Sequence, residues 1–219
     1  MKRNFITKLH NSTKRNYLNR MKDQKVYCMK IAKKYGKEYW DGNRRFGYGG
    51  YKYIPGRWKN VAKKIIKLYK LKPGSKVLDV GCGKGFLLLE LLKIQPKLKI
   101  TGVDISSYAL QEAQKNKKLR TIKHNVKKKL PFKRKTFDLV ISLATLHNLE
   151  IFDLAISISE IERVGKQKYI MVESYRNEKE LFNLQCWALT CESFFSQNEW
   201  LWLFKKLKYK GDFEFIFFK

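Results

Sequence analysis

A short glycine-rich segment carries the strongest chemical signal in the chain. Residues 77–80 form an apolar run broken only by Asp79, glycines follow at positions 81, 83 and 85, and residues 87–92 are again apolar. This order predicts a buried strand, a tight turn and a helix. Glycines let the backbone of a turn approach a ligand without an intervening Cβ, and the first N–H groups of a helix can bind polar ligand groups. The segment therefore predicts a site for a nucleotide-type ligand.

The spacing of the glycines discriminates between ligand classes. A dinucleotide-binding turn reads G-x-G-x-x-G, whereas position 86 is Phe, so that pattern fails at its last glycine. An acidic residue two positions before G-x-G-x-G resembles the first motif of the class I S-adenosylmethionine (SAM) dependent methyltransferases. The resemblance implies that SAM, or its product S-adenosylhomocysteine, contacts this segment at Asp79, Gly81, Cys82, Gly83 and Gly85.

A second acidic residue follows the next predicted strand, residues 99–105. Asp104 lies 25 residues after Asp79, about the distance expected for one helix and one strand. In this fold a carboxylate at the end of the second strand accepts hydrogen bonds from both ribose hydroxyls, although an isolated Asp after a strand is more often a helix N-cap. The resemblance implies that Asp104 and Ile105 contact the ribose side of the cofactor. It also implies that Asn125 and Val126, after a short third strand, hold the adenine edge.

Two candidate proton acceptors follow the fourth and fifth predicted strands. Residues 130–132 (Leu-Pro-Phe) and 137–140 (Phe-Asp-Leu-Val) resemble the fourth-strand region of small-molecule and ubiquinone-biosynthesis-type methyltransferases, so Ser142 should border the cofactor. Ligands of open α/β sheets bind outside the carboxyl ends of the strands, where His147 and Glu173 are expected. His147 could instead hydrogen-bond the backbone or border the ligand without catalysing. Glu173 could instead bind an amine-bearing acceptor or pair with a nearby Arg or Lys.

An aromatic and glycine-rich segment, residues 39–58, precedes the central strand. It holds five glycines, one proline, four tyrosines and two tryptophans, which favours neither a helix nor a regular strand. Loops of this length are usually lids or binding loops, or else disordered, and the aromatic density argues against disorder. Candidate contacts to the SAM carboxylate or to the acceptor are Tyr48, Tyr51 and Arg57, together with Tyr175 after the fifth strand. Alternatively, the loop packs over the sheet edge.

The periodicity of the whole chain predicts a Rossmann-like, doubly wound α/β fold with a mostly parallel sheet. Six strands are expected, or seven if residues 208–210 also pair, and the C-terminal edge strand could pair between subunits. An N-terminal arm, helix and lid loop over residues 1–57 should precede a SAM-binding domain over residues 58–219. Residues 1–12 should be a loose arm. The expected helices span residues 13–35, 58–69, 152–164, 177–195 and 196–207.

The net charge of +29 is concentrated in the first third of the chain, where the first 72 residues hold 22 Lys and Arg against 3 acidic residues. Such a surface could contact RNA or an anionic membrane face. Only 10 of the 48 basic residues are Arg, whereas bidentate phosphate recognition favours Arg. The composition therefore favours a lysine-rich chain without a polyanionic partner.

The four cysteines show neither metal-ligand spacing nor a dense disulfide framework, which is typical of reduced thiols in the cytoplasm. No apolar run approaches the ~20 residues of a membrane span, and no apolar segment follows the basic N-terminus as in a secretory signal. We expect a cytoplasmic enzyme that transfers the SAM methyl group to a small molecule, with His147 or Glu173 as base. An RNA acceptor bound by the basic N-terminal surface, and a SAM-binding partner protein without turnover, are the alternatives.

Overall fold

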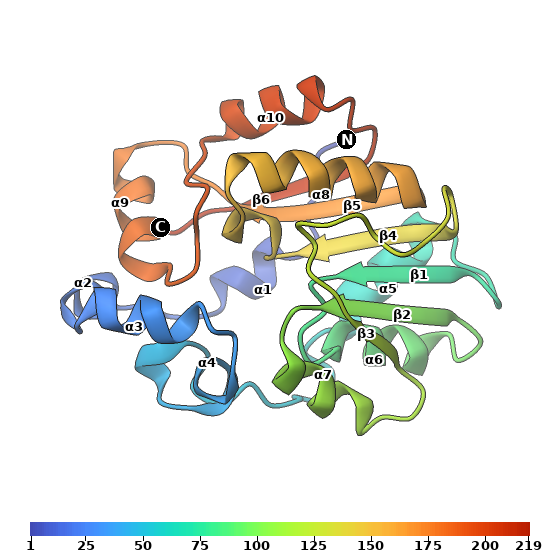
Figure 1. Cartoon of the computed structure of the whole chain (residues 1–219), viewed down its shortest axis with the longest axis horizontal. Helices are drawn as coiled ribbons and strands as arrows, with labels where there is room; N and C mark the ends of the chain where they lie inside the picture. Colours follow the sequence, from blue (N-terminus) through green and yellow to red (C-terminus); the bar gives the residue numbers. More distant parts are fainter.

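Six parallel strands form one sheet, and their order places the glycine turn at its centre. The computed structural model describes residues 1–219. The strand order is β3-β2-β1-β4-β5-β6 (Figure 1). The strands are β1 (Lys76–Val80), β2 (Lys99–Asp104), β3 (Arg120–Lys123), β4 (Phe137–Leu143), β5 (Gly165–Glu173) and β6 (Asp212–Ile216). The chain moves outward from β1 to β3 and returns to β4 beside β1, so a ligand crevice is expected at this reversal.

The sheet confirms the Rossmann-like fold with the lower of the two expected strand numbers. Residues 208–210 form no strand. Every neighbouring pair of strands is parallel. A closing hairpin, which is usual in the family that the sequence resembles, is therefore absent, and β6 runs parallel to β5.

Helices cover both faces of the sheet (Figure 1). On one face lie α5 (Lys59–Leu68), α6 (Phe86–Ile94) and α7 (Ser107–Gln114), and on the other lie α8 (Ile151–Val164) and α10 (Gln197–Lys206). The remaining helical segments are α1 (Thr7–Asn11), α2 (Tyr17–Lys22), α3 (Lys25–Ala32), α4 (Lys37–Asp41), α9 (Glu178–Trp187) and the 3-10 turns η1 (Arg44–Phe46) and η2 (Leu146–Asn148). A bilayer could not be crossed by any of these helices, since none is both long and apolar enough.

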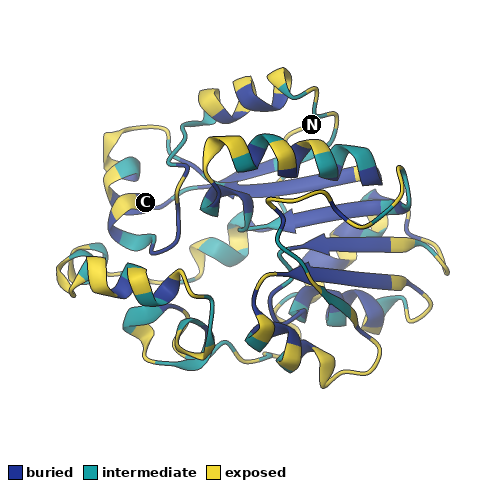
Figure 2. Ribbon diagram, viewed as in Figure 1, coloured by how far each residue is buried: buried dark blue, intermediate teal, exposed yellow.

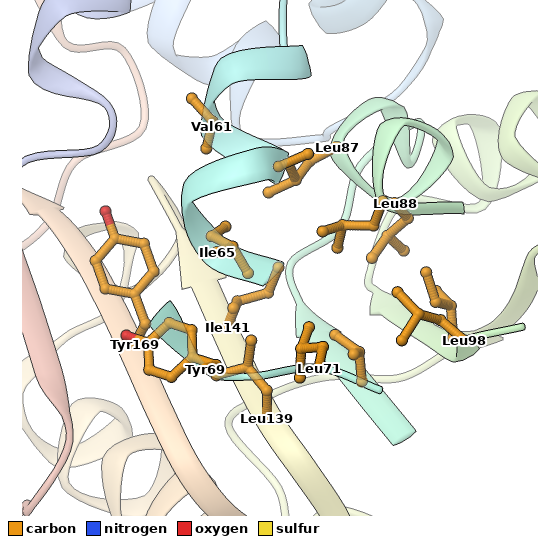
Figure 3. Packing of buried hydrophobic residues seen from close by; sticks show 14 of the residues in the cluster. Val61, Ile65, Tyr69, Leu71, Leu87, Leu88, Leu98, Leu139, Ile141 and Tyr169 are labelled. Atoms are coloured by element: carbon orange, nitrogen blue, oxygen red, sulfur yellow. The ribbon is translucent and has the colours of Figure 1, made fainter. Parts of the chain in front are cut away.

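Strand residues alternate between two apolar layers. Leu139 and Ile141 of β4 pack with Ile65 of α5 in the first layer, which Figure 3 shows. Val140 points to the opposite face, where it packs in the layer that contains Trp200 of α10. Because both faces of a parallel sheet are covered, its inner strands read as apolar runs, and Figure 2 shows these strands buried along most of their length. The edge strand β3 has no buried residue.

Three of the expected helix boundaries were wrong. The helix predicted over residues 13–35 is broken into α2 and α3 at Gln24, which has φ +43°. The segment 39–58, which was predicted to form neither a helix nor a regular strand, contains the end of α4 and all of η1. The helix predicted over residues 177–195 ends at Trp187, where Ala188 adopts an extended backbone. Further along, the N–H groups of Glu192 and Ser193 donate to the carbonyl of His147.

The prediction of a loose arm over residues 1–12 was also wrong. The Arg3 N–H donates to the Phe213 carbonyl over 2.7 Å, and the Phe213 N–H donates to the Met1 carbonyl over 3.1 Å. The Ile6 side chain is buried in the first apolar layer. This part of the β6 edge is therefore already paired within the chain, and pairing of the edge between subunits stays a prediction. The division of the chain at residue 57 stays a prediction.

One buried carboxylate fixes this N-terminal segment. The Glu214 side chain of β6 accepts hydrogen bonds from the backbone N–H groups of Phe5, Ile6 and Thr7, at 2.6–2.9 Å, and from the Thr7 hydroxyl. The Tyr169 hydroxyl of β5 donates to the same carboxylate over 2.5 Å. These donors offset the cost of burying a charge.

Replacing this carboxylate should destabilise the fold. We expect Glu214→Gln to lower the free energy of unfolding by about 3 kcal/mol, because an amide can satisfy fewer of these buried donors. Urea unfolding followed by circular dichroism would measure the change. Glu178→Gln, an exposed substitution in α9, is the matched control and should change stability by only about 0.5 kcal/mol. Equal losses in both variants would contradict this role of Glu214.

Candidate active site

A cavity of about 590 Å³ opens where the strands end, between the sheet, the N-terminal segment and α9. Figure 1 shows α2–α4 and α9 on the side toward which the arrows of β1, β2 and β4 point. Most of the predicted site residues line it: Asp79, Gly81, Cys82, Gly83, Asp104, Ile105, Asn125, Val126, His147, Glu173, Tyr48, Tyr51 and Arg57. Three do not. The Ser142 hydroxyl donates to the Val80 carbonyl in the sheet, Tyr175 forms a bridge with Ser196, and Gly85 begins α6.

The glycine turn leaves no room for side chains. Gly81 has φ +84°, and a Cβ there would collide with the Thr145 side chain, which follows β4. Gly83 has φ +53°, and a Cβ there would lie 2.7 Å from the Trp40 ring. Only glycine combines this backbone conformation with such close neighbours. The turn is therefore packed directly against Thr145 and the Trp40 ring.

Asp104 ties the glycine turn to the start of α7. Its carboxylate accepts hydrogen bonds from the N–H groups of Gly83 and Ser106, both at 2.8 Å. The N-cap of α7 is Ser106, whose hydroxyl accepts from the Ala109 N–H, so the N-cap alternative for Asp104 was wrong. Burial raises the pKa of Asp104. Each carboxylate oxygen can accept a further bond from a ligand hydroxyl.

Asp79 is a buried carboxyl group with an unused oxygen. It is 5% exposed, and its Oδ1 atom has no hydrogen-bond partner. Burial, and then the charge of Asp104, raise the pKa of Asp79 to about 8. A cationic ligand group at this position would supply the missing partner and favour the ionised carboxylate.

His147 and Glu173 face each other at the ends of β4 and β5. The Glu173 N–H donates to Nδ1 of His147 over 3.2 Å, and a ring nitrogen that accepts leaves the proton of the neutral imidazole on Nε2. Nε2 lies 3.4 Å from Oε2 of Glu173. Burial lowers the pKa of His147 to about 3 and raises that of Glu173 to about 7, although the Arg15 charge lowers the latter. His147 is thus a neutral donor toward Glu173, and Glu173 titrates near neutrality.

Aromatic side chains of the predicted lid, residues 39–58, lie over the glycine turn. Trp40 is buried, and its indole N–H donates to the Ser106 hydroxyl over 2.9 Å. Tyr48 stacks on Trp40 with ring centroids 5.2 Å apart, and Tyr51 stacks on Phe86 at the start of α6. The lid thus lies over the glycine turn rather than over the sheet edge.

An ion pair that the sequence did not reveal fastens this lid. Asp41 accepts from the Lys84 ammonium over 2.6 Å, from the Tyr108 hydroxyl over 2.6 Å and from the Tyr51 N–H over 3.0 Å. Lys84 is buried inside the glycine turn. The only available signal was that Asp41 is one of three acidic residues in a strongly basic third of the chain.

Neutralising Asp41 should loosen the lid. We expect Asp41→Asn to raise the trypsin cleavage rate in the lid about tenfold, because losing about 1.4 kcal/mol from the closed state raises the open population by that factor. Mass spectrometry of the fragments would locate the cut. Asp153→Asn is the control, since Asp153 pairs with Lys127 and both residues lie outside the lid. An unchanged rate in Asp41→Asn would show that this ion pair does not hold the lid.

Comparisons with known proteins agree with this geometry. A family model described as a methyltransferase domain matches residues 71–211, more than half of the chain. The chain belongs to the class I SAM-dependent methyltransferases. The 24-methylenesterol C-methyltransferase 3 of Arabidopsis thaliana is 30% identical over 144 residues, 58% of this chain and 40% of that protein. The ribosomal RNA small subunit methyltransferase C of Buchnera aphidicola is 36% identical over 115 residues, 50% of this chain and 32% of that protein.

The methyltransferase fold is also found among solved structures. The YcgJ protein of Bacillus subtilis superimposes with a TM-score of 0.54 at 21% identity, covering 67% of this chain and 66% of that chain. The chain spans half or less of the length of the two curated relatives that it matches. What is shared with the solved structure is therefore the fold.

The residues of the cavity fit SAM, the cofactor of this family. The glycine turn lines the cavity with Gly81 and Gly83, and the unpartnered Oδ1 of Asp79 suits the α-ammonium group of the cofactor. Asp104 offers acceptors for ribose hydroxyls, and Ile105, which is 46% exposed, lines the cavity beside it. The individual contacts stay predictions.

Cofactor binding should release a proton near neutral pH. Because the pKa of Asp79 is raised to about 8, this carboxyl group is mostly protonated at pH 7, and a bound ammonium group would ionise it. We expect release of about one proton per S-adenosylhomocysteine at about pH 7, falling toward zero above about pH 9. Calorimetry in buffers of different ionisation enthalpy measures this number. Asp79→Asn should abolish the release, whereas Glu192→Gln, on the surface, should retain it.

Proposed function

We propose that this chain transfers the methyl group of SAM to a nucleophile of a small-molecule acceptor, with Glu173 as the general base. The observation that carries the proposal is one cavity that joins the glycine turn and Asp104 at one end to Glu173 at the other. The bound cofactor supplies an electrophilic methyl group. The protein aligns the acceptor, excludes water and removes a proton where the acceptor has one.

Glu173 fits the role of proton acceptor better than His147. A general base works best with a pKa near the working pH, and burial raises the pKa of Glu173 to about 7. His147 has its Nδ1 occupied by the Glu173 N–H, and its pKa is lowered to about 3. It therefore holds Glu173 in position through Nε2, as a positioning residue.

The lid supports a small acceptor. Trp40 and Tyr48 cover the cavity, and the Asp41–Lys84 ion pair fastens that cover across the glycine turn. Water is excluded by such a closed site. The similarity to a sterol methyltransferase agrees with an acceptor of this class.

An RNA acceptor is the second candidate function. The similarity to a ribosomal RNA methyltransferase and the charge of the first 72 residues favour it. RNA binding would weaken steeply with salt, because phosphate contacts release counterions. A small acceptor held inside the cavity predicts a much weaker dependence on salt.

Methyl transfer from labelled SAM into a metabolite extract, and separately into total RNA, tests both candidates. We expect label in a small molecule. Glu173→Gln should lower that transfer by about 10²-fold or more while S-adenosylhomocysteine affinity stays within about threefold. The rate of methyl transfer by the wild type should rise with pH through about 7, because Glu173 loses its proton there. The rate of Glu173→Gln should not show this rise with pH.

Two further variants sharpen the result. In His147→Ala the rise of the transfer rate should occur at a higher pH, because Glu173 loses a hydrogen-bond donor that stabilises its carboxylate. Glu192→Gln, an exposed carboxylate outside the cavity, should transfer methyl groups at the wild-type rate. Label found only in RNA would favour the RNA acceptor, and cofactor binding without any transfer would favour a non-catalytic protein.

A further inference from the structure

Three arginines gather around one tryptophan on the α9 side of the cavity. The guanidinium carbons of Arg15, Arg20 and Arg44 lie 5.5, 5.2 and 5.1 Å from the centre of the Trp187 ring. All four residues line the cavity. The arginines come from three places in the chain, before α2, within α2 and in η1. The arginine cluster is thus assembled by the fold.

The arginine cluster has no acidic partner. The nearest carboxylates are engaged elsewhere, since Asp23 pairs with Arg45 and Glu173 with His147. The Nε atoms of Arg15 and Arg20 are buried and lack any hydrogen-bond partner. Burial, together with the charge of Arg44, lowers the pKa values of Arg15 and Arg20. Three like charges held together with free donors are unfavourable unless an anion joins them.

Neutral groups hold the guanidinium groups in place. Arg20 donates to the Arg44 carbonyl over 2.6 Å, and Arg44 donates to the Gly47 carbonyl. Arg15 lies 3.1 Å from Nδ1 of His10, whose Nε2 lies 3.0 Å from the Phe217 carbonyl. Burial, and then the Arg15 charge, lower the pKa of His10 to about 4, so His10 is neutral near pH 7. It accepts from Arg15 through Nδ1 without adding charge.

The arginine cluster lies at the acceptor end of the cavity. Arg15 lies 5.2 Å from the ring of Phe218, two residues after Ile216, which is the register partner of Glu173 in the sheet. The Arg15 charge also lowers the pKa of Glu173. Trp187 is the last residue of α9. Figure 1 shows α9 remote from the junction of β1 and α6, where the glycine turn lies. Arg57, a predicted contact to the cofactor carboxylate or to the acceptor, also lines the cavity but is not part of the arginine cluster.

We propose that the arginine cluster binds a terminal phosphate or diphosphate of the methyl acceptor, an inference that rests on the proposed small-molecule transfer. Guanidinium groups bind phosphate through paired, charge-assisted hydrogen bonds. A terminal phosphate carries about −1.5 to −2 charges at pH 7, which matches three cations better than a single carboxylate does. An RNA phosphodiester carries one charge on an extended strand and would leave most of the arginine cluster unpaired.

Inorganic pyrophosphate is a direct probe of this site. Calorimetric titration of the full chain saturated with S-adenosylhomocysteine should give one binding site with a dissociation constant below about 1 mM. Arg20→Gln and Arg44→Gln should each weaken the affinity about tenfold or more. Arg45→Gln removes one positive charge from the residue next to Arg44. Because Arg45 does not line the cavity, this variant should keep the pyrophosphate affinity within about twofold.

The outcomes separate this inference from the proposed function. The phosphate site is refuted, while methyl transfer stands, if S-adenosylhomocysteine binds but pyrophosphate does not bind up to about 10 mM. The same conclusion follows if Arg44→Gln and Arg45→Gln weaken the pyrophosphate affinity equally. If pyrophosphate binds as expected but the cofactor does not, the arginine cluster is supported and the transfer is refuted. If a 5′-hydroxyl RNA oligonucleotide binds in an arginine-dependent manner and pyrophosphate fails to compete, the site belongs to RNA and the inference is overturned. Circular dichroism of each variant confirms that it is folded.

Discussion

The carboxylate of Asp104 connects the glycine turn, the start of α7 and the lid. It holds the N–H groups of Gly83 and Ser106 at the same distance, 2.8 Å, so the glycine turn after β1 and the start of α7 after β2 share one buried anchor. Ser106 in turn accepts from Trp40, which extends the connection to the lid. Because a buried carboxylate must have its acceptors satisfied, the turn, the second strand and the lid are constrained together.

Much of the sheet could be predicted because local sequence and burial agree there. β4 and β5 are apolar runs since helices cover both faces, and Asp79 with Gly81 and Gly83 marks the turn without reference to distant residues. Ligand contacts at strand ends follow from topology alone. Ser142 shows the limit of this reasoning, because its side chain points to the β1 backbone rather than toward the cavity.

The N-terminal third could not be predicted because distant contacts decide its conformation. Nothing local requires the left-handed backbone at Gln24 that breaks the expected helix. Residues 5–7 are fixed by Glu214, more than 200 positions away in the sequence. The same holds for the arginine cluster, since Arg15, Arg20 and Arg44 are unremarkable members of a basic composition until the fold places Trp187 between them. Periodicity reports burial, whereas these contacts depend on charges brought together by the tertiary structure.

The position of the lid has a consequence for the order of events in a catalytic cycle. Lys84 belongs to the glycine turn, while its partner Asp41 belongs to the lid above that turn. Tyr48, in the same lid, stacks on Trp40 and also lines the cavity. Separating the ion pair would therefore move the aromatic cover as well, so a single opening step would precede any exchange of what the cavity holds.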